Sequence, residues 1–103
     1  MSRVILEGKT AGETVIETFD FTSRLAASET ISTAVVTASV YSGTDAAPSS
    51  VISGTATISG QKVTQKVTAG TLGVIYTLLC TITTSLGQTL SLTAFLPVIP
   101  ATQ

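Results

Sequence analysis

The segment GVIYTLLCTITTSLGQTLSLTAFLPV, residues 73–98, constrains the fold more than any other part of the chain. Apolar residues alternate with Thr and Ser, a Ser-Leu-Gly-Gln turn interrupts the pattern, and the alternation then resumes. A period of two is typical of a β-strand with one buried face. We therefore predict two antiparallel strands whose inward residues are Val74, Tyr76, Leu78, Cys80 and Ile82, then Leu90, Leu92, Ala94 and Leu96. Pro97 is expected to end the return strand, because proline cannot donate a ladder hydrogen bond.

The rest of the chain shows the same pattern in shorter pieces. Strands are predicted over residues 14–21, 31–41, 51–59 and 61–69, which are rich in Val, Ile and Thr. Residues 22–30 form either a loop or a single helical turn, and the composition of residues 42–50 predicts a loop. Short strands separated by turns at this spacing indicate an antiparallel β-sandwich.

Tyr76 follows the Gly-rich corner Ala69-Gly70-Thr71, near the start of the second-last predicted strand. In some sandwiches a tyrosine at such a corner hydrogen-bonds back to the backbone. Two interpretations remain open at this point: the hydroxyl bonds the backbone around Thr71, or Tyr76 is simply a core aromatic.

Charge is scarce. Charged residues make up 11% of the 103 residues, against about 25% in an average soluble domain. Twenty threonines and twelve serines supply the polar surface instead, and the net charge is −1. No basic field is present to hold nucleic acid or an anionic membrane, so we expect neither as a partner. The sequence MSRVILEGKTAGE lacks the apolar core of a signal peptide.

The sequence offers little for catalysis. Histidine is absent, and Cys80 is the only cysteine. No Ser–His or Cys–His dyad, cysteine-pair metal site or internal disulfide can therefore form. Glu17 and Asp20 fall on opposite faces of one predicted strand, and no phosphate-binding glycine motif is present. We predict a non-enzyme with no catalytic, metal or cofactor residues, in which Cys80 is a buried apolar side chain with a raised pKa.

Three aromatic residues, Phe19, Tyr41 and Phe95, are the candidates for a carbohydrate-type site, but we expect each of them to pack in the core.

Both ends of the chain contain apolar segments that suggest protein contacts. Val4-Ile5-Leu6 precedes a Gly-containing stretch, and Leu96-Pro97-Val98-Ile99 closes the last strand. We predict an N-terminal arm (1–13), a sandwich (14–96) and a C-terminal tail (97–103). The predicted partner contacts are Val4, Ile5, Leu6, Leu96, Pro97, Val98 and Ile99, by addition to a neighbour's sheet edge. The alternative is that each segment lies on its own domain as an edge strand.

Two stretches together resemble a known group of proteins. In ETFDFTSRLAASETISTAVVTASV (17–40), Asp-Phe is followed by Ser-Arg-Leu and a strand beginning Glu-Thr-Ile. In TAGTLGVIYTLLCTITTSLGQTLSLTAFLPV (68–98), Ala-Gly-x-x-Gly-x-x-Tyr-x-Leu-x-Cys leads into Ile-Thr-Thr-Ser-x-Gly-Gln-Thr. In this order, across residues 15–98, the chain resembles small tailed-phage virion proteins with Ig-like folds, known as fibre–tail adaptor or virion structural proteins. It departs from them in having no Trp after the first strand.

The resemblance implies an all-β, Ig-like antiparallel β-sandwich of about seven strands. It also implies a non-enzymatic virion protein, made in the bacterial host cytoplasm and without a cofactor. Its expected role is an adaptor in the tail, neck or fibre-attachment region that contacts other virion proteins and forms a homo-oligomer. The alternatives are a capsid cement protein and a soluble glycan- or ligand-binding module that uses loops 42–50 and 84–88.

Overall fold

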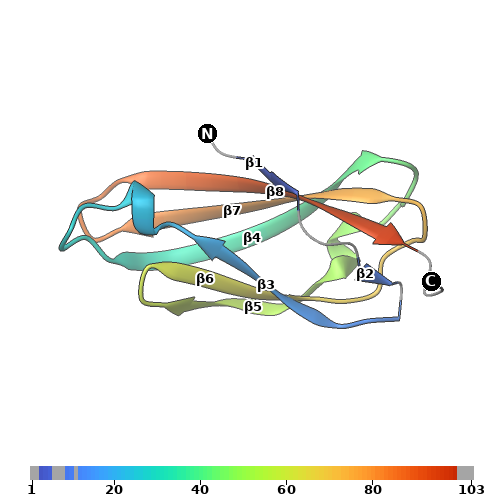
Figure 1. Cartoon of the computed structure of the whole chain (residues 1–103), viewed down its shortest axis with the longest axis horizontal. Helices are drawn as coiled ribbons and strands as arrows, with labels where there is room; N and C mark the ends of the chain where they lie inside the picture. Colours follow the sequence, from blue (N-terminus) through green and yellow to red (C-terminus); the bar gives the residue numbers. More distant parts are fainter. Residues whose placement is uncertain (1–2, 6–8, 11, 100–103) are drawn as a thin grey trace.

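The computed structural model, which describes residues 3–5, 9–10 and 12–99, is a two-layered β-sandwich with extents of 44 × 23 × 22 Å (Figure 1). Within those residues, six strands build the two layers and two shorter strands lie at one edge. The long strands are β3 (Val15–Asp20), β4 (Ile31–Ser42), β5 (Ile52–Ser59), β6 (Lys62–Val67), β7 (Ile75–Thr84) and β8 (Thr89–Ile99). The short strands are β1 (Arg3–Ile5) and β2 (Lys9–Thr10).

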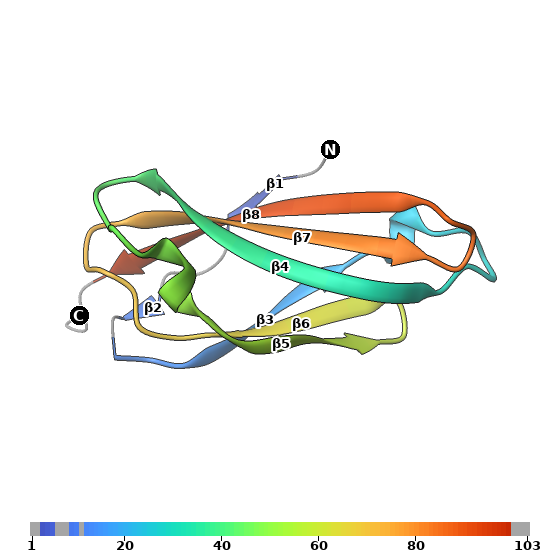
Figure 2. The ribbon, with the colours of Figure 1, turned by 180° about the vertical axis from the view of Figure 1, so that it is seen from behind.

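The larger sheet has the order β1-β8-β7-β4, with β2 also paired to β8, and the smaller sheet has the order β3-β6-β5. Figure 2 shows the two layers from behind, with β4 above β5. The prediction of an all-β sandwich is therefore confirmed. All the pairings are antiparallel except those of β1 and β2, which run parallel to β8.

The core lies between the sheets and follows the predicted alternation. Along β7 every second residue is buried, and Tyr76, Leu78, Cys80 and Ile82 are all 0% exposed. The facing strand β6 contributes Val63 and Val67, and the segments around β3 and β5 add aromatic and aliphatic groups. Because most side chains of this core are apolar, its burial supplies the main driving force for folding.

Pro97 does not end the last strand. Strand β8 continues to Ile99, so residues 97–99 belong to the sheet instead of a tail. The Val98 N–H donates to the Val74 carbonyl at 3.0 Å, on the side of β7. In an antiparallel ladder, neighbouring residues direct their backbone groups to opposite sides. The Pro97 nitrogen therefore faces the outer edge, between the positions paired with β1 and β2, where no ladder donor is needed.

The N-terminal segment forms edge strands on its own domain. Arg3–Ile5 pairs with Thr93–Phe95, and Lys9–Thr10 pairs with Val98–Ile99. This is the edge-strand alternative of the sequence analysis, and not a detached arm at these positions. Leu6 lies outside the described residues.

The connections contain two short 3-10 helices. The predicted helical turn is η1 (Thr22–Arg24), and the predicted loop 42–50 leads into η2 (Pro48–Val51). Strand β5 carries a register shift between Ser53 and Thr57. The amide of the buried Gln65 donates to the Ser53 carbonyl at 3.1 Å, which satisfies a backbone acceptor beside this irregularity.

Candidate functional site

The described residues hold no group of three or more His, Cys, Asp or Glu side chains arranged to bind a metal. Cys80 is fully buried, and burial raises the pKa of its thiol to about 12. The prediction that Cys80 is a buried apolar side chain is therefore confirmed, because a thiol of this pKa is almost entirely protonated at neutral pH.

Tyr76 joins the core to one end of the sandwich, so the two interpretations of this residue combine. Its ring is 0% exposed, and its hydroxyl accepts a hydrogen bond from the Thr71 N–H at 2.8 Å. The predicted backbone contact at Thr71 is confirmed. The hydroxyl also donates to Asp45 Oδ2 at 2.5 Å. No local pattern points to Asp45, because it lies 31 residues away from Tyr76 in a loop.

These contacts fix the loop after β4. Asp45 Oδ1 accepts from the Ala47 N–H at 2.9 Å, so both carboxylate oxygens are engaged. The bonds from Tyr76 and Ala47 lower the pKa of Asp45, and burial followed by the bond to Asp45 raises the pKa of Tyr76. Asp45 has a structural role here, because its carboxylate closes the loop over the tyrosine corner.

Glu29 has the same role at the opposite end. Its carboxylate, 2% exposed, accepts hydrogen bonds from the Thr84 hydroxyl and from the Ala26 N–H, the latter at 3.0 Å. The Thr84 hydroxyl in turn accepts from the Gln88 N–H at 3.2 Å. The turn between β7 and β8 is thereby tied to the loop before β4. No local pattern predicts this contact, because Glu29 and Thr84 are 55 residues apart.

The domain is expected to lose stability in acid. The hydrogen bonds from Thr84 and Ala26 lower the pKa of Glu29 from its ordinary value of 4.5, and the pKa of Asp45 is lowered as well. A carboxyl whose pKa is lower in the folded state stabilises the fold above its unfolded pKa, and that contribution disappears as pH falls through the folded pKa. Chemical denaturation should therefore show a free energy of unfolding that is constant near neutral pH and declines below about pH 4.5.

The variant Glu29→Gln tests this prediction. It should flatten the acid decline of the free energy of unfolding, because the carboxyl group that titrates is removed. Equal acid profiles for wild type and Glu29→Gln would contradict the role of Glu29 in the loss of stability in acid.

Loops 42–50 and 84–88 do not form one site. The first is bound to Tyr76 near the start of β7, and the second is bound to Thr84 at its end. With a rise of about 3.3 Å per residue along a strand, the two loops lie roughly 25 Å apart. A small ligand cannot contact both, so the geometry does not support a binding module that uses the two loops together.

The outer surface of the larger sheet carries no charge across its three long strands. Strands β4, β7 and β8 contain no Asp, Glu, Lys or Arg. Their outward residues alternate from Thr33 to Tyr41 on β4, from Ile75 to Thr83 on β7 and from Thr89 to Pro97 on β8. We call this surface the uncharged face. Charge at the core of protein–protein interfaces is depleted in the same way.

One end of the uncharged face is apolar and hollowed. Tyr41, Ile75, Phe95 and Pro97 line a hollow of about 210 Å³, and the rings of Tyr41 and Phe95 are 4.5 Å apart between centroids. The register brings these residues together, because Ile75 lies opposite Pro97 and Thr77 lies opposite Phe95. At the other end the face is hydroxyl-rich, with the Thr81 and Ser91 hydroxyls 3.2 Å apart. The hollow can accept an apolar side chain from another protein.

The expectation that all three candidate aromatics pack in the core was wrong for two of them. Phe19 is 4% exposed and lies in the core. Tyr41 is 62% exposed and Phe95 is half-buried, both on the uncharged face. The period of two places Tyr41 on the same side as Thr33 and Thr37, and places Phe95 opposite the buried Ala94 and Leu96.

The structure places some of the predicted contact residues at the chain ends in the core and others on the surface. Leu96 and Val98 are 0% and 3% exposed and face the core, so their side chains offer no surface to a partner. Pro97 lines the hollow, and Ile99 is 43% exposed. The backbone of Val4 and Ile5 lies in β1, and Leu6 is outside the described residues.

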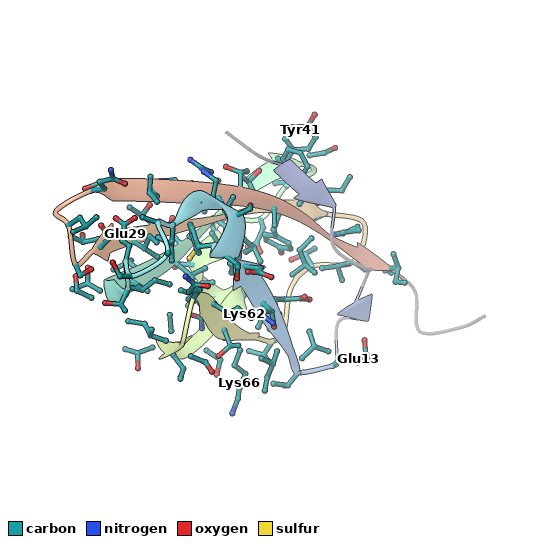
Figure 3. All side chains as sticks on the ribbon, turned by 60° about the vertical axis from the view of Figure 1, so that its left-hand side comes forward. Glu13, Glu29, Tyr41, Lys62 and Lys66 are labelled. Carbon is teal, nitrogen blue, oxygen red and sulfur yellow. The ribbon has the colours of Figure 1, made fainter. Side chains whose placement is uncertain are left out.

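The outer surface of the smaller sheet, unlike the uncharged face, carries charged side chains. Lys62 and Lys66 are exposed on β6, and Asp20 lies opposite Lys62 in the register. Figure 3 shows Tyr41 projecting at the top of the molecule and Lys66 projecting at the bottom. The two outer surfaces of the sandwich are therefore chemically distinct, and only that of the larger sheet combines exposed aromatic area with an absence of charge over its long strands.

Fold and surface together define a small all-β module with an apolar hollow on the outer face of its larger sheet. A family model described as Podophage GP4 fiber-tail adaptor protein gp77 matches residues 9–97. The chain belongs to this family of phage tail structural proteins, which confirms the resemblance to fibre–tail adaptors and indicates a location in the virion. No curated protein and no solved structure matches the chain. Within the residues described, no helix has the length and hydropathy to cross a membrane.

Proposed function

We propose that this chain is a non-enzymatic adaptor that joins fibre and tail components of a phage virion through its uncharged face. The observation that carries this proposal is the hollow lined by Tyr41, Ile75, Phe95 and Pro97, on the outer face of three long strands that contain no charged residue. Membership of the fibre–tail adaptor family supports the same role.

The composition of the face suits a protein contact. Interface hot spots are enriched in aromatic residues and lie in pockets from which water is excluded. Tyr41 and Phe95 supply the aromatic area, and the Thr and Ser side chains around them can bond at a polar rim. An apolar side chain of another virion protein, seated between the two rings, would bury them both.

The strand order supports the Ig-like form of the sandwich. Strands β3-β6-β5 and β4-β7-β8 have the order of strands B-E-D and C-F-G of an immunoglobulin domain. We propose this classification, in which the tyrosine corner at Tyr76 takes its usual place near the start of strand F.

We also propose that the chain ends contribute to contacts with other virion proteins, and that the chain forms a homo-oligomer in the particle. Pro97 lines the hollow and Ile99 lies in the last strand beside it, and Val4 and Ile5 lie in β1 at the edge of β8. Leu6 follows them in the sequence. Deletion of residues 97–103 is a poor test of this proposal, because it removes the buried Val98.

A charge placed in the hollow tests the adaptor role. Tyr41→Lys is expected to leave the domain folded but to lower its incorporation into virions at least tenfold, because an interface core excludes an unpaired ammonium group. Ile16→Lys is the matched control, since Ile16 is 64% exposed on the smaller sheet and Tyr41 is 62% exposed on the larger one. Incorporation is measured by quantitative mass spectrometry of particles grown with each variant as the sole copy.

Normal incorporation of Tyr41→Lys would contradict the proposal. The copy number from the same wild-type particles separates an adaptor from capsid cement. A number that matches the symmetry of the tail supports the adaptor, and a number that matches the capsid lattice would overturn it.

A further inference from the structure

Strand β4 forms an open edge of the larger sheet. It pairs with β7 on one side, and no strand among the described residues pairs with its other side. Strand β5 belongs to the opposite layer, as Figure 2 shows. Sandwich proteins usually protect such an edge with charge, proline or a very short strand. Strand β4 has 12 residues, and none of them is charged or is a proline.

The middle of β4 is regular. Register shifts occur between Ile31 and Thr33 and between Val40 and Ser42, and the pairing with β7 is continuous from Thr33 to Val40. The outward residues of this stretch, Thr33, Val35, Thr37 and Ser39, are all exposed. The ladder of β4 is therefore uninterrupted along this stretch, and no strand of the described residues is hydrogen-bonded to its outer side.

The hydrogen-bond pattern shows which backbone groups face outward. The Thr84 N–H donates to the Gln88 carbonyl. The backbone N–H and C=O groups of the even-numbered residues of β7 are therefore directed to β8. The Thr83 carbonyl accepts from the Ser32 hydroxyl at 2.9 Å, which places the odd-numbered residues toward β4. The odd-numbered residues of β4 therefore bond β7. The even-numbered residues Ala34, Val36, Ala38 and Val40 direct their N–H and C=O groups to the open edge.

This side of the sandwich carries almost no charge. Between Glu29 and Lys62 the sequence contains one charged residue, Asp45, and its carboxylate is bound to Tyr76 and Ala47. The opposite side of the sandwich has β3 as its edge strand, and β3 carries Glu17 and Asp20. Two copies of the β4 side can therefore meet without like-charge repulsion, whereas two β3 edges would bring acids together.

We propose that two copies of this chain pair along β4, antiparallel about a two-fold axis, to form a continuous sheet. Only pairings that bring even-numbered residues together satisfy the outward backbone groups. The register that satisfies all of them places Ala34 opposite Val40 of the second copy and Val36 opposite Ala38 of the second copy. Thr37 then lies on the axis beside Thr37 of the second copy. The pairing rests on the homo-oligomer proposed above and specifies its subunit contact, which is the β4 edge. It also brings the uncharged faces of two copies side by side.

A cysteine on the axis tests the register. In a non-hydrogen-bonded antiparallel pair the Cα atoms are about 4.5 Å apart, which is within the range of disulfides. Thr37→Cys should form a covalent dimer in oxidised glutathione at least tenfold faster than Thr18→Cys, which changes an exposed threonine of the edge strand β3. The native Cys80 is fully buried and does not interfere.

A mixture of Val35→Cys and Ser39→Cys chains extends the same test, because these positions face each other in this register alone. The mixture should give a mixed dimer faster than either variant gives a dimer by itself. Equal rates for Thr37→Cys and Thr18→Cys would overturn the proposal, and so would a mixed pair that does not react.

Analytical ultracentrifugation of the native chain provides the second test. The wild type is expected to form a dimer of two 10.5 kDa chains. Thr37→Lys should sediment as a monomer with an unchanged circular dichroism spectrum, and Thr18→Lys should remain dimeric. A wild type that stays monomeric at millimolar concentration would overturn the pairing. Loss of virion incorporation by Tyr41→Lys in that case would leave the adaptor proposal standing, so the two failures are distinguishable.

Discussion

Replacement of Tyr76 by Ala is expected to lower the free energy of unfolding by about 3–5 kcal/mol. The ring is fully buried between the sheets, and its removal leaves a cavity that the surrounding strands cannot fill. The change also takes away the hydroxyl that holds the Thr71 N–H and the Asp45 carboxylate. For a domain of this size the melting temperature should fall by more than about 10 °C, as measured by calorimetry.

The variant Tyr76→Phe separates the two contributions. It keeps the ring and removes the hydroxyl, so we expect a loss of about 1–2 kcal/mol. Tyr41→Ala is the control on the surface, where the expected change is below about 1 kcal/mol because the ring is mostly exposed. A Tyr76→Ala variant as stable as Tyr41→Ala would show that the tyrosine corner contributes little.

Gly70→Ala is the second substitution with a large expected effect, a loss of about 2–4 kcal/mol. Gly70 has φ +98°, a conformation that side-chain-bearing residues rarely adopt. A Cβ atom at this position would also lie 2.9 Å from Val98 Cγ2, which is buried in the core. Strain and overpacking therefore act together, and chemical denaturation should show a lower midpoint with an unchanged slope.

Gly73→Ala provides the matched comparison for Gly70. Gly73 has a similar φ of +87°, but a Cβ atom there has no neighbour within 4 Å. The difference between the two variants isolates the contact with Val98. Equal losses for Gly70→Ala and Gly73→Ala would show that backbone conformation alone accounts for the effect.

The periodicity of the sequence predicts most of this fold. In β7 the alternation from Tyr76 to Ile82 identifies the buried face, and the Gly-rich corner gives the bond at Thr71 as one of two interpretations of Tyr76. The pattern fails at Pro97, because sequence alone does not say on which side of β8 the missing N–H falls. It also does not pair Glu29 with Thr84, since the contact depends on how two distant loops meet.

The candidate site is only partly visible in the sequence. The absence of charge from the long strands can be seen directly, and the period of two places Tyr41 and Phe95 on the polar side of their strands. Their proximity depends on the order β4-β7-β8, which brings positions 54 residues apart onto one surface. For both rings the strand position indicates the surface, whereas their hydrophobic character favours the core, and the structure follows the strand position.

The position of β1 and β2 along β8 has a consequence for the size of any assembly. These strands lie at the edge of the larger sheet that is across from β4, so that edge ends in strands of only three and two residues, which offer little ladder to another chain. A subunit with one long open edge can join one neighbour through it, whereas a subunit with two such edges can polymerise. If copies pair along β4 as proposed, the short strands β1 and β2 therefore favour a finite assembly.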